Sequence, residues 1–115
     1  MKVKVSRIAM LEAWGLPGWE EEAKDLIPGR RYRFDLAERK LKIAIEIQGG
    51  IWMGMERKGA HALPTNHLRD MEKANLAQIE GYIVLQFTPQ QFDSGQAYKT
   101  IMTAVMKRTL SPPPL

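Results

Sequence analysis

The sequence predicts a single α/β (α+β) domain whose central mixed sheet is flanked by helices. Two stretches of alternating apolar and polar residues, 31–37 and 41–48, are typical of half-buried strands. Stretches in which apolar residues recur every three or four positions lie before and after them, as expected of helices that pack on a sheet. The expected order of elements is therefore α-β-β-β-α-β-α.

The N-terminal part is expected to hold a short helix and an edge strand. Ser6 is a suitable N-cap for the helix, and Gly15 followed by Pro17 is a suitable end. The acidic segment 19–27 is interpreted as an edge strand that leads into a tight turn at Pro28-Gly29.

The two alternating stretches are predicted to form a β-hairpin. Its turn is placed around Arg39 and Lys40, and Gly49-Gly50 breaks the second strand. The apolar positions of both strands then face a core, and the polar positions face the other side. Residues 51–65 show no clear period and are interpreted as a loop.

The C-terminal half is expected to contribute a helix, a strand and a last helix. The first helix runs from Thr65 or Asn66 to about Glu80. The stretch 82–87 is almost continuously apolar, which predicts a central strand buried on both faces. The last helix is expected from about Gly95, with its apolar residues on one side.

Length and composition indicate one intracellular domain. We assign residues 1–110 of the 115 to the domain and the proline-rich residues 111–115 to a disordered tail. The chain has no cysteine, which excludes disulfides and fits a reducing compartment. No apolar run approaches the roughly 18 residues of a membrane span, and the first valines alternate with lysines, unlike a signal peptide. We therefore expect a cytoplasmic protein that does not enter membranes.

Positive charge is concentrated in one stretch. Residues 30–42 carry six basic and two acidic groups, a net charge of +4 that equals the formal net charge of the whole chain. Such a patch suits a polyanion, most often the phosphate backbone of a nucleic acid, and the alternative is a solvated basic hairpin. The candidate DNA-binding residues are Arg30, Arg31, Arg33, Lys40 and Lys42, together with Lys58 and His61 in the following loop.

Two carboxylates on the polar side of the hairpin form a candidate metal site. With the turn at the predicted place, Asp35 lies opposite Ala44 and Glu46 lies opposite Arg33, so the two acids are diagonal neighbours roughly 7–8 Å apart. A tight second turn would place Glu22 directly opposite Asp35. Such oxygen ligands suit Mg²⁺ or Mn²⁺, which activates water against a phosphodiester. The alternative is a surface hairpin whose acids balance its arginines.

The order Arg-Tyr-Arg-Phe-Asp35, a short spacer, and then Ile-Ala-Ile-Glu46-Ile-Gln48 resembles the catalytic core of the PD-(D/E)XK nuclease superfamily. That family places an acid at the end of one strand and Glu-X-Lys on the next, inside a restriction-endonuclease-like αβββαβ core. Downstream, Asp70-Met-Glu-Lys73 and 81–88 are also similar to small phage and bacterial members. The resemblance covers roughly residues 15–108 and would make the chain one nuclease domain.

The resemblance implies that Asp35 and Glu46 bind the metal together with the backbone carbonyl of Ile47. Gln48 occupies the place of the family's lysine; its amide can orient water by hydrogen bonding but carries no positive charge. Lys73, on the following helix, is the candidate that supplies the missing cation, with a plain surface pair to Asp70 as the alternative.

A third acid is expected from the resolvase members, which carry a glutamate at the start of their first helix. Glu12 is too close to Gly15 to match that position well. Glu22 is therefore the preferred third acid, and Glu12 the alternative.

The resemblance implies a metal-dependent, structure-selective DNA endonuclease, best matched by the Holliday-junction resolvases, phage-encoded ones included. A homodimer would then nick opposing strands of a four-way junction symmetrically. A mismatch-nicking or other PD-(D/E)XK endonuclease is the nearest alternative. From other classes, Gln48 keeps open a catalytically decayed DNA-binding module, and the loop with Trp52 and Met53 keeps open an adaptor that docks a partner.

Overall fold

The computed structural model describes residues 5–48 and 65–114 and confirms an α+β domain with a four-stranded mixed sheet. In chain order its elements are α1 (Arg7–Ala13), β1 (Glu20–Lys24), β2 (Arg33–Glu38), β3 (Ile43–Ile47), α3 (Thr65–Ile79), β4 (Ile83–Phe87), α4 (Pro89–Asp93) and α5 (Tyr98–Leu110). None of the helices in this part of the chain combines the length and apolar character that a membrane crossing needs.

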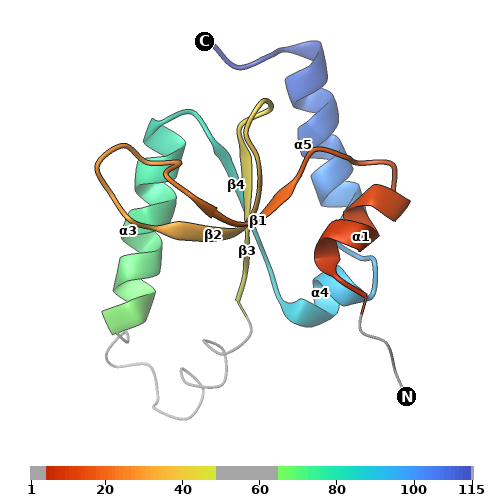
Figure 1. Cartoon of the computed structure of the whole chain (residues 1–115), viewed down its shortest axis with the longest axis horizontal. Helices are drawn as coiled ribbons and strands as arrows, with labels where there is room; N and C mark the ends of the chain where they lie inside the picture. Colours follow the sequence, from red (N-terminus) through yellow and green to blue (C-terminus); the bar gives the residue numbers. More distant parts are fainter. Residues whose placement is uncertain (1–4, 49–64, 115) are drawn as a thin grey trace.

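The strands lie in the order β1-β2-β3-β4. Figure 1 shows the sheet between α3 on one side and α1, α4 and α5 on the other. β1, β2 and β3 pair antiparallel, whereas β3 and β4 pair parallel. A parallel pair needs a crossover from one end of the sheet to the other, and the segment that contains α3 makes it. The carboxyl ends of β3 and β4 therefore lie next to each other, at the same end of the sheet.

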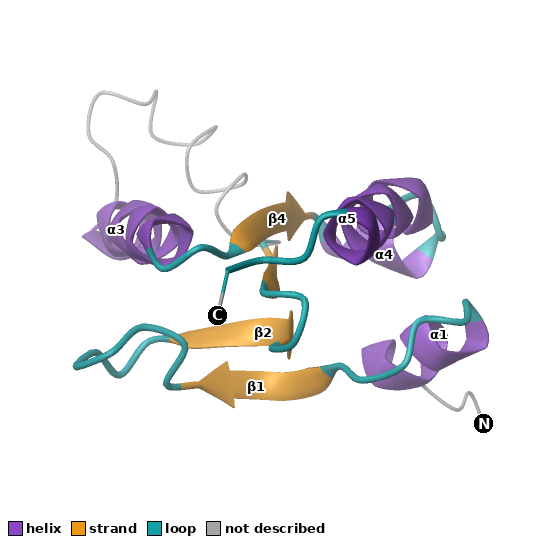
Figure 2. Ribbon diagram, turned by 90° about the horizontal axis from the view of Figure 1, so that it is seen from above, coloured by secondary structure: helices purple, strands orange, loops and turns teal. Residues whose placement is uncertain are grey.

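Both faces of the sheet are covered by helices. Figure 2 shows α3 on one side of β4 and α4 and α5 on the other. One buried cluster contains Leu36 and Ile45 with Phe92 and Ile101 of α4 and α5. The other cluster gathers side chains of the hairpin, of α3 and of Tyr82: Phe34, Ala37, Ala44, Ala77 and Tyr82. The side of the hairpin that was predicted to be polar thus carries a second core. Ala37 and Ala44 are small, so α3 can pack close to the strands there.

The strict alternation predicted along β2 breaks at Asp35. Phe34 and Leu36 are two residues apart, yet they pack into different clusters. The switch coincides with Glu22, which faces this point from β1 and has a left-handed φ of +50°. Such a φ is uncommon for a residue other than glycine, and it marks the point at which the strand pair departs from regular geometry.

The prediction of a central strand at 82–87 was wrong. β4 begins at Ile83, lies at the edge of the described sheet and is only half-buried along most of its length. An edge strand covered by helices on both faces has the same apolar composition as a central strand, so the residues alone do not separate the two.

A helix that the sequence analysis did not predict, α4, precedes the last one, which begins at Tyr98 rather than near Gly95. Thr88 caps α4 through a capping box. Its hydroxyl accepts a hydrogen bond from the backbone N–H of Gln91, and the side-chain oxygen of Gln91 accepts one from the backbone N–H of Thr88. Pro89 takes the first helical position, which its ring favours.

Candidate active site

The backbone ladder between β2 and β3 ends at the pair Leu36–Ile45, and the two strands open into a fork beyond it. The next residues along the strands are Asp35 and Glu46. The register places them directly opposite each other, whereas the sequence analysis predicted diagonal neighbours. The register differs by two residues because the turn is longer than expected. Glu38 is still paired, to Ile43, and four residues close the turn.

The two carboxylates replace the missing rungs of the ladder. The backbone N–H of Asp35 donates to Glu46 Oε1 at 3.1 Å, and the backbone N–H of Ile47 donates to Asp35 Oδ2 at 2.6 Å. Each acid therefore holds the opposite strand through its backbone. This fixes the orientation of both carboxylates at the mouth of the fork.

Lys73 reaches the fork from α3. Its Nζ lies 2.7 Å from Glu46 Oε2, and the two side chains are only 10% and 13% exposed. The same ammonium lies 4.5 Å from the centre of the Phe34 ring, a cation–π arrangement. One helical turn on, Ala77 packs against the sheet and holds this face of α3 in place. The structure thus brings together Asp35, Glu46 and Lys73, three of the predicted site residues.

Burial raises the pKa of the Glu46 carboxyl above its ordinary value, because the charged form loses water. The hydrogen bond and the charge of Lys73 oppose this shift, and the nearby Asp35 adds to it. A partly desolvated carboxylate next to a second one is a place where a cation is electrostatically favoured.

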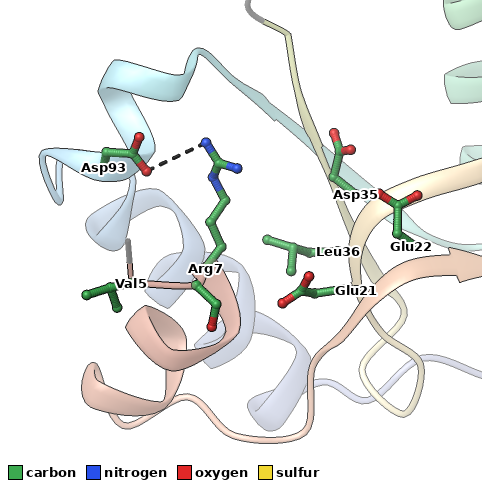
Figure 3. A pocket seen from close by; sticks show the side chains of 8 residues that line it. Val5, Arg7, Glu21, Glu22, Asp35, Leu36 and Asp93 are labelled. Carbon is green, nitrogen blue, oxygen red and sulfur yellow. Dashed lines mark ion pairs between the residues drawn. The ribbon is translucent and has the colours of Figure 1, made fainter. Parts of the chain in front are cut away.

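Glu22 lies beside Asp35, which is the register that a tight turn at Pro28-Gly29 predicts. The strands stop short of that turn, however: β1 ends at Lys24, not near Ile27, and residues 25–32 connect it to Arg33. The pairs Glu21–Leu36 and Ala23–Phe34 flank Glu22 and set this register. Glu22 and Asp35 line one wall of a pocket of about 330 Å³ (Figure 3).

The opposite wall of that pocket is formed by residues that the sequence analysis missed. Arg7 of α1 and Asp93 of α4 lie there, with 3.6 Å between Arg7 Nη2 and Asp93 Oδ1. They lie 28 residues before and 58 residues after Asp35, and no local pattern in the sequence connects them to it.

Gln48 does not contact the carboxylates through any hydrogen bond found among the described residues. Its Nε2 instead donates to Gln86 Oε1 of β4 at 2.6 Å, and its backbone N–H donates to the Phe87 carbonyl at 2.7 Å. Gln86, also missed by the sequence analysis, pairs in register with Glu46. At this level of the sheet each strand carries one polar residue: Glu22, Asp35, Glu46 and Gln86.

The fork presents oxygen atoms of the chemical kind that divalent cations prefer. Asp35 and Glu46 supply carboxylate oxygens, the hard ligands that Mg²⁺ and Mn²⁺ prefer. The N–H of Ile47 points to Asp35, and in a strand the carbonyl of the same residue faces the same neighbour, so it faces the fork as well. Within 5–48 and 65–114, no three Asp, Glu, His or Cys side chains form a cluster that could hold an ion. Two carboxylates and a backbone carbonyl are therefore the protein ligands on offer, and Mg²⁺ commonly completes such a set with water.

The predicted basic patch is divided between the two ends of the hairpin. Arg31 and Arg33 are exposed beside the fork, whereas Lys40 and Lys42 lie at the turn, about 20 Å away along a six-residue strand. Lys42 Nζ donates to the Glu80 carbonyl at the end of α3, at 3.0 Å. The described basic residues of this stretch therefore lie at two places on the hairpin.

Arg30 is held in a surface cluster at the fork end. Its guanidinium lies 2.6 Å from Glu72 Oε1 and 3.0 Å from the Tyr32 hydroxyl, which itself donates to Glu72. Lys58 and His61, the other two predicted DNA-binding residues, lie outside the described residues.

A scan against protein-family models and searches of curated proteins and of solved structures found no match to this chain.

Proposed function

We propose that this chain is a metal-dependent endonuclease that hydrolyses phosphodiester bonds in DNA. The observation that carries the proposal is the convergence of Asp35, Glu46 and the buried Lys73 at the fork, from three different elements. Two acids that can hold a metal ion beside a fixed ammonium match the needs of phosphodiester hydrolysis, in which negative charge builds up on the phosphate oxygens.

The two acids and the Ile47 carbonyl would hold Mg²⁺ or Mn²⁺. A bound ion of this kind lowers the pKa of water and offsets the charge of the phosphate. Asp35 and Glu46 are already oriented by their backbone hydrogen bonds, and a bound ion would share the Glu46 carboxylate with Lys73. The deprotonated Glu46 is the form that binds metal, and its raised pKa makes metal affinity increase with pH.

Lys73 and Glu22 would complete the chemistry. The Lys73 ammonium is anchored between Glu46 and the Phe34 ring, where it can offset charge on the reacting phosphate. It takes the role that Gln48 cannot fill, because an amide has no charge. Glu22 is exposed on the pocket side of Asp35 and can accept the proton of the attacking water.

The proposed substrate is branched DNA, a four-way junction in the first place, cut by a homodimer. Arg31 and Arg33 lie beside the fork and would bind backbone phosphates there, giving affinity that falls with salt and carries little base specificity. A cytoplasmic location fits this substrate. A mismatch-nicking or other endonuclease of the same chemistry is the nearest alternative.

The test is cleavage of a labelled four-way junction beside a linear duplex of the same sequence, in Mg²⁺, in Mn²⁺ and in EDTA. We expect paired nicks in the junction that EDTA abolishes and that Asp35→Asn reduces by at least about 100-fold. Asp25→Asn is the matched control, because Asp25 is exposed and its left-handed backbone suits asparagine.

Each other outcome has a definite meaning. Equal cutting of both substrates keeps the nuclease and removes the junction preference. Binding of both substrates without cleavage in either metal overturns the proposed activity and favours the DNA-binding module.

A further inference from the structure

A second pocket lies beside the acids, at the carboxyl ends of β3 and β4. It has a volume of about 290 Å³ and is lined by Gln48, Gln86, Phe87, Thr88 and Gln91. Glu46 is the register partner of Gln86 on the neighbouring strand, about 4.8 Å away at the backbone, and stands two residues before Gln48. The pocket therefore adjoins the candidate metal ligands. None of the side chains that line it is charged.

Within residues 5–48 and 65–114, some hydrogen-bonding groups of this pocket have no partner. Thr88 and Gln91 use their side chains on each other's backbone in the cap of α4. Gln48 and Gln86 share one hydrogen bond, from Gln48 Nε2 to Gln86 Oε1. A glutamine side chain offers two N–H donors and a carbonyl oxygen, so the pair keeps the Gln48 oxygen as an acceptor and the Gln86 amide as a donor.

The charge of the surroundings decides which part of a nucleotide suits the pocket. A phosphate would meet the carboxylate of Glu46 on the adjacent strand and no cation among the lining residues. A nucleobase is neutral, carries donors and acceptors on its edge, and pairs well with glutamine amides. Phe87 adds an apolar surface for its ring.

We propose that the Gln48–Gln86 pair forms a nucleobase-binding subsite next to the fork, for a base close to the phosphate that is cut. The subsite rests on the proposed nucleic-acid substrate but not on catalysis. It also assigns Gln48 to substrate recognition, because its amide is turned to Gln86 and Lys73 occupies the place beside Glu46.

The test measures affinity rather than cleavage. Labelled 12-nucleotide single strands of dA, dC and dT, and an abasic strand with the same number of phosphates, are titrated with the full chain. Fluorescence anisotropy is read in Ca²⁺ and again in EDTA. We expect at least one base-containing strand to bind about fivefold more tightly than the abasic strand, a difference within the range expected for one or two hydrogen bonds.

Two variants assign that difference to the pocket. Gln86→Met and Gln48→Met keep the length of the side chain but remove the amide, and each should bring the preferred strand to the affinity of the abasic one. Affinity for the abasic strand should stay within twofold of the wild type. Gln90→Met is the control, because Gln90 is exposed on α4 and does not line the pocket. Either variant alone suffices if the other does not fold.

The outcomes separate this inference from the proposed activity. Equal affinity for all strands, or a base preference that both variants retain, overturns the subsite even if the chain cuts DNA. Base-dependent binding that the variants remove supports the subsite even if no junction is cut. No affinity for any strand overturns the subsite and the nucleic-acid substrate together.

Discussion

The β2–β3 hairpin ends in a closed turn on one side and in an open fork on the other. At the turn, both oxygens of Glu38 accept backbone amides, from Lys40 at 2.9 Å and from Leu41 at 3.2 Å. At the fork, Asp35 and Glu46 also accept backbone amides, but each does so across to the opposite strand. Hydrogen bonds from backbone N–H groups to a carboxylate thus stabilise the turn at one end of the hairpin and the separated strands at the other end.

The two ends differ in how the oxygens of their carboxylates are used among the described residues. Glu38 is buried and uses both oxygens on amides two and three residues away. At the fork, one oxygen of Asp35 accepts no hydrogen bond from the described residues, and one oxygen of Glu46 holds the Lys73 ammonium. A carboxylate that local backbone satisfies is structural, whereas one that retains an oxygen or a cation can take part in chemistry.

The largest expected effect comes from breaking the fork at Lys73. Lys73→Met leaves Glu46 buried without its cation, which should lower the free energy of unfolding by about 3 kcal/mol. Cleavage under saturating substrate should fall by about 100-fold, because a charge that faces the transition state is lost. Urea unfolding and single-turnover cleavage measure the two effects.

Lys99→Met is the control, because Lys99 is an exposed lysine of α5. Loss of stability with an unchanged cleavage rate would show that Lys73 only supports the fork. The role assigned to it in the proposed reaction would then be wrong.

A smaller effect is expected at the turn. Glu38→Gln keeps one acceptor but points an N–H₂ group at a backbone N–H, which should cost about 1–2 kcal/mol of unfolding free energy. Cleavage per folded molecule should stay unchanged, because Asp35 is three residues, about 10 Å, along the strand. The urea midpoint and the cleavage rate of the same preparation give both values. A stable variant that has lost cleavage would contradict the separation of the two ends.

Local pattern was sufficient to place the two acids on neighbouring strands, but it predicted neither the fork nor the register. Alternation placed Asp35 and Glu46 on neighbouring strands, and the Pro-Gly turn placed Glu22 opposite Asp35. The two-residue error between β2 and β3 arose at Glu38, whose side chain stabilises a four-residue turn that ends at Lys42 with φ +54°. Alternation along a strand says nothing about such a contact.

The rest of the site depends on long-range contacts. Gln86 lies next to Glu46 only because β4 pairs parallel with β3 after the crossover, and Arg7 reaches the pocket from α1. Neither position has a local signal. The α4 cap, in contrast, was visible in the sequence as Thr88 followed by proline and, at the third helical position, Gln91.

The smallest expected effect is at the surface cluster of Arg30, Tyr32 and Glu72, which ties the fork end of the hairpin to α3. The hydrogen bond from Arg30 is the main cause that lowers the pKa of the Glu72 carboxyl from its ordinary value of 4.5, and Tyr32 adds to it. A carboxyl with a lowered folded-state pKa stabilises the fold above its ordinary pKa and loses this contribution as the pH falls through the lowered value. Glu72→Gln should therefore be less stable than wild type at pH 7, and the two should converge in acid.

Urea unfolding of both proteins between neutral and acid pH tests the direction, and added salt should shrink the difference because the pair is exposed. A difference that grows in acid would mean that the Glu72 pKa is raised instead.

The same variant also tests DNA binding at the two ends of the hairpin, because it frees the Arg30 guanidinium beside the fork. If phosphates bind at this end of the hairpin, Glu72→Gln binds DNA more tightly at low salt and Arg31→Gln more weakly. Lys40→Gln, at the closed turn, should change DNA affinity least.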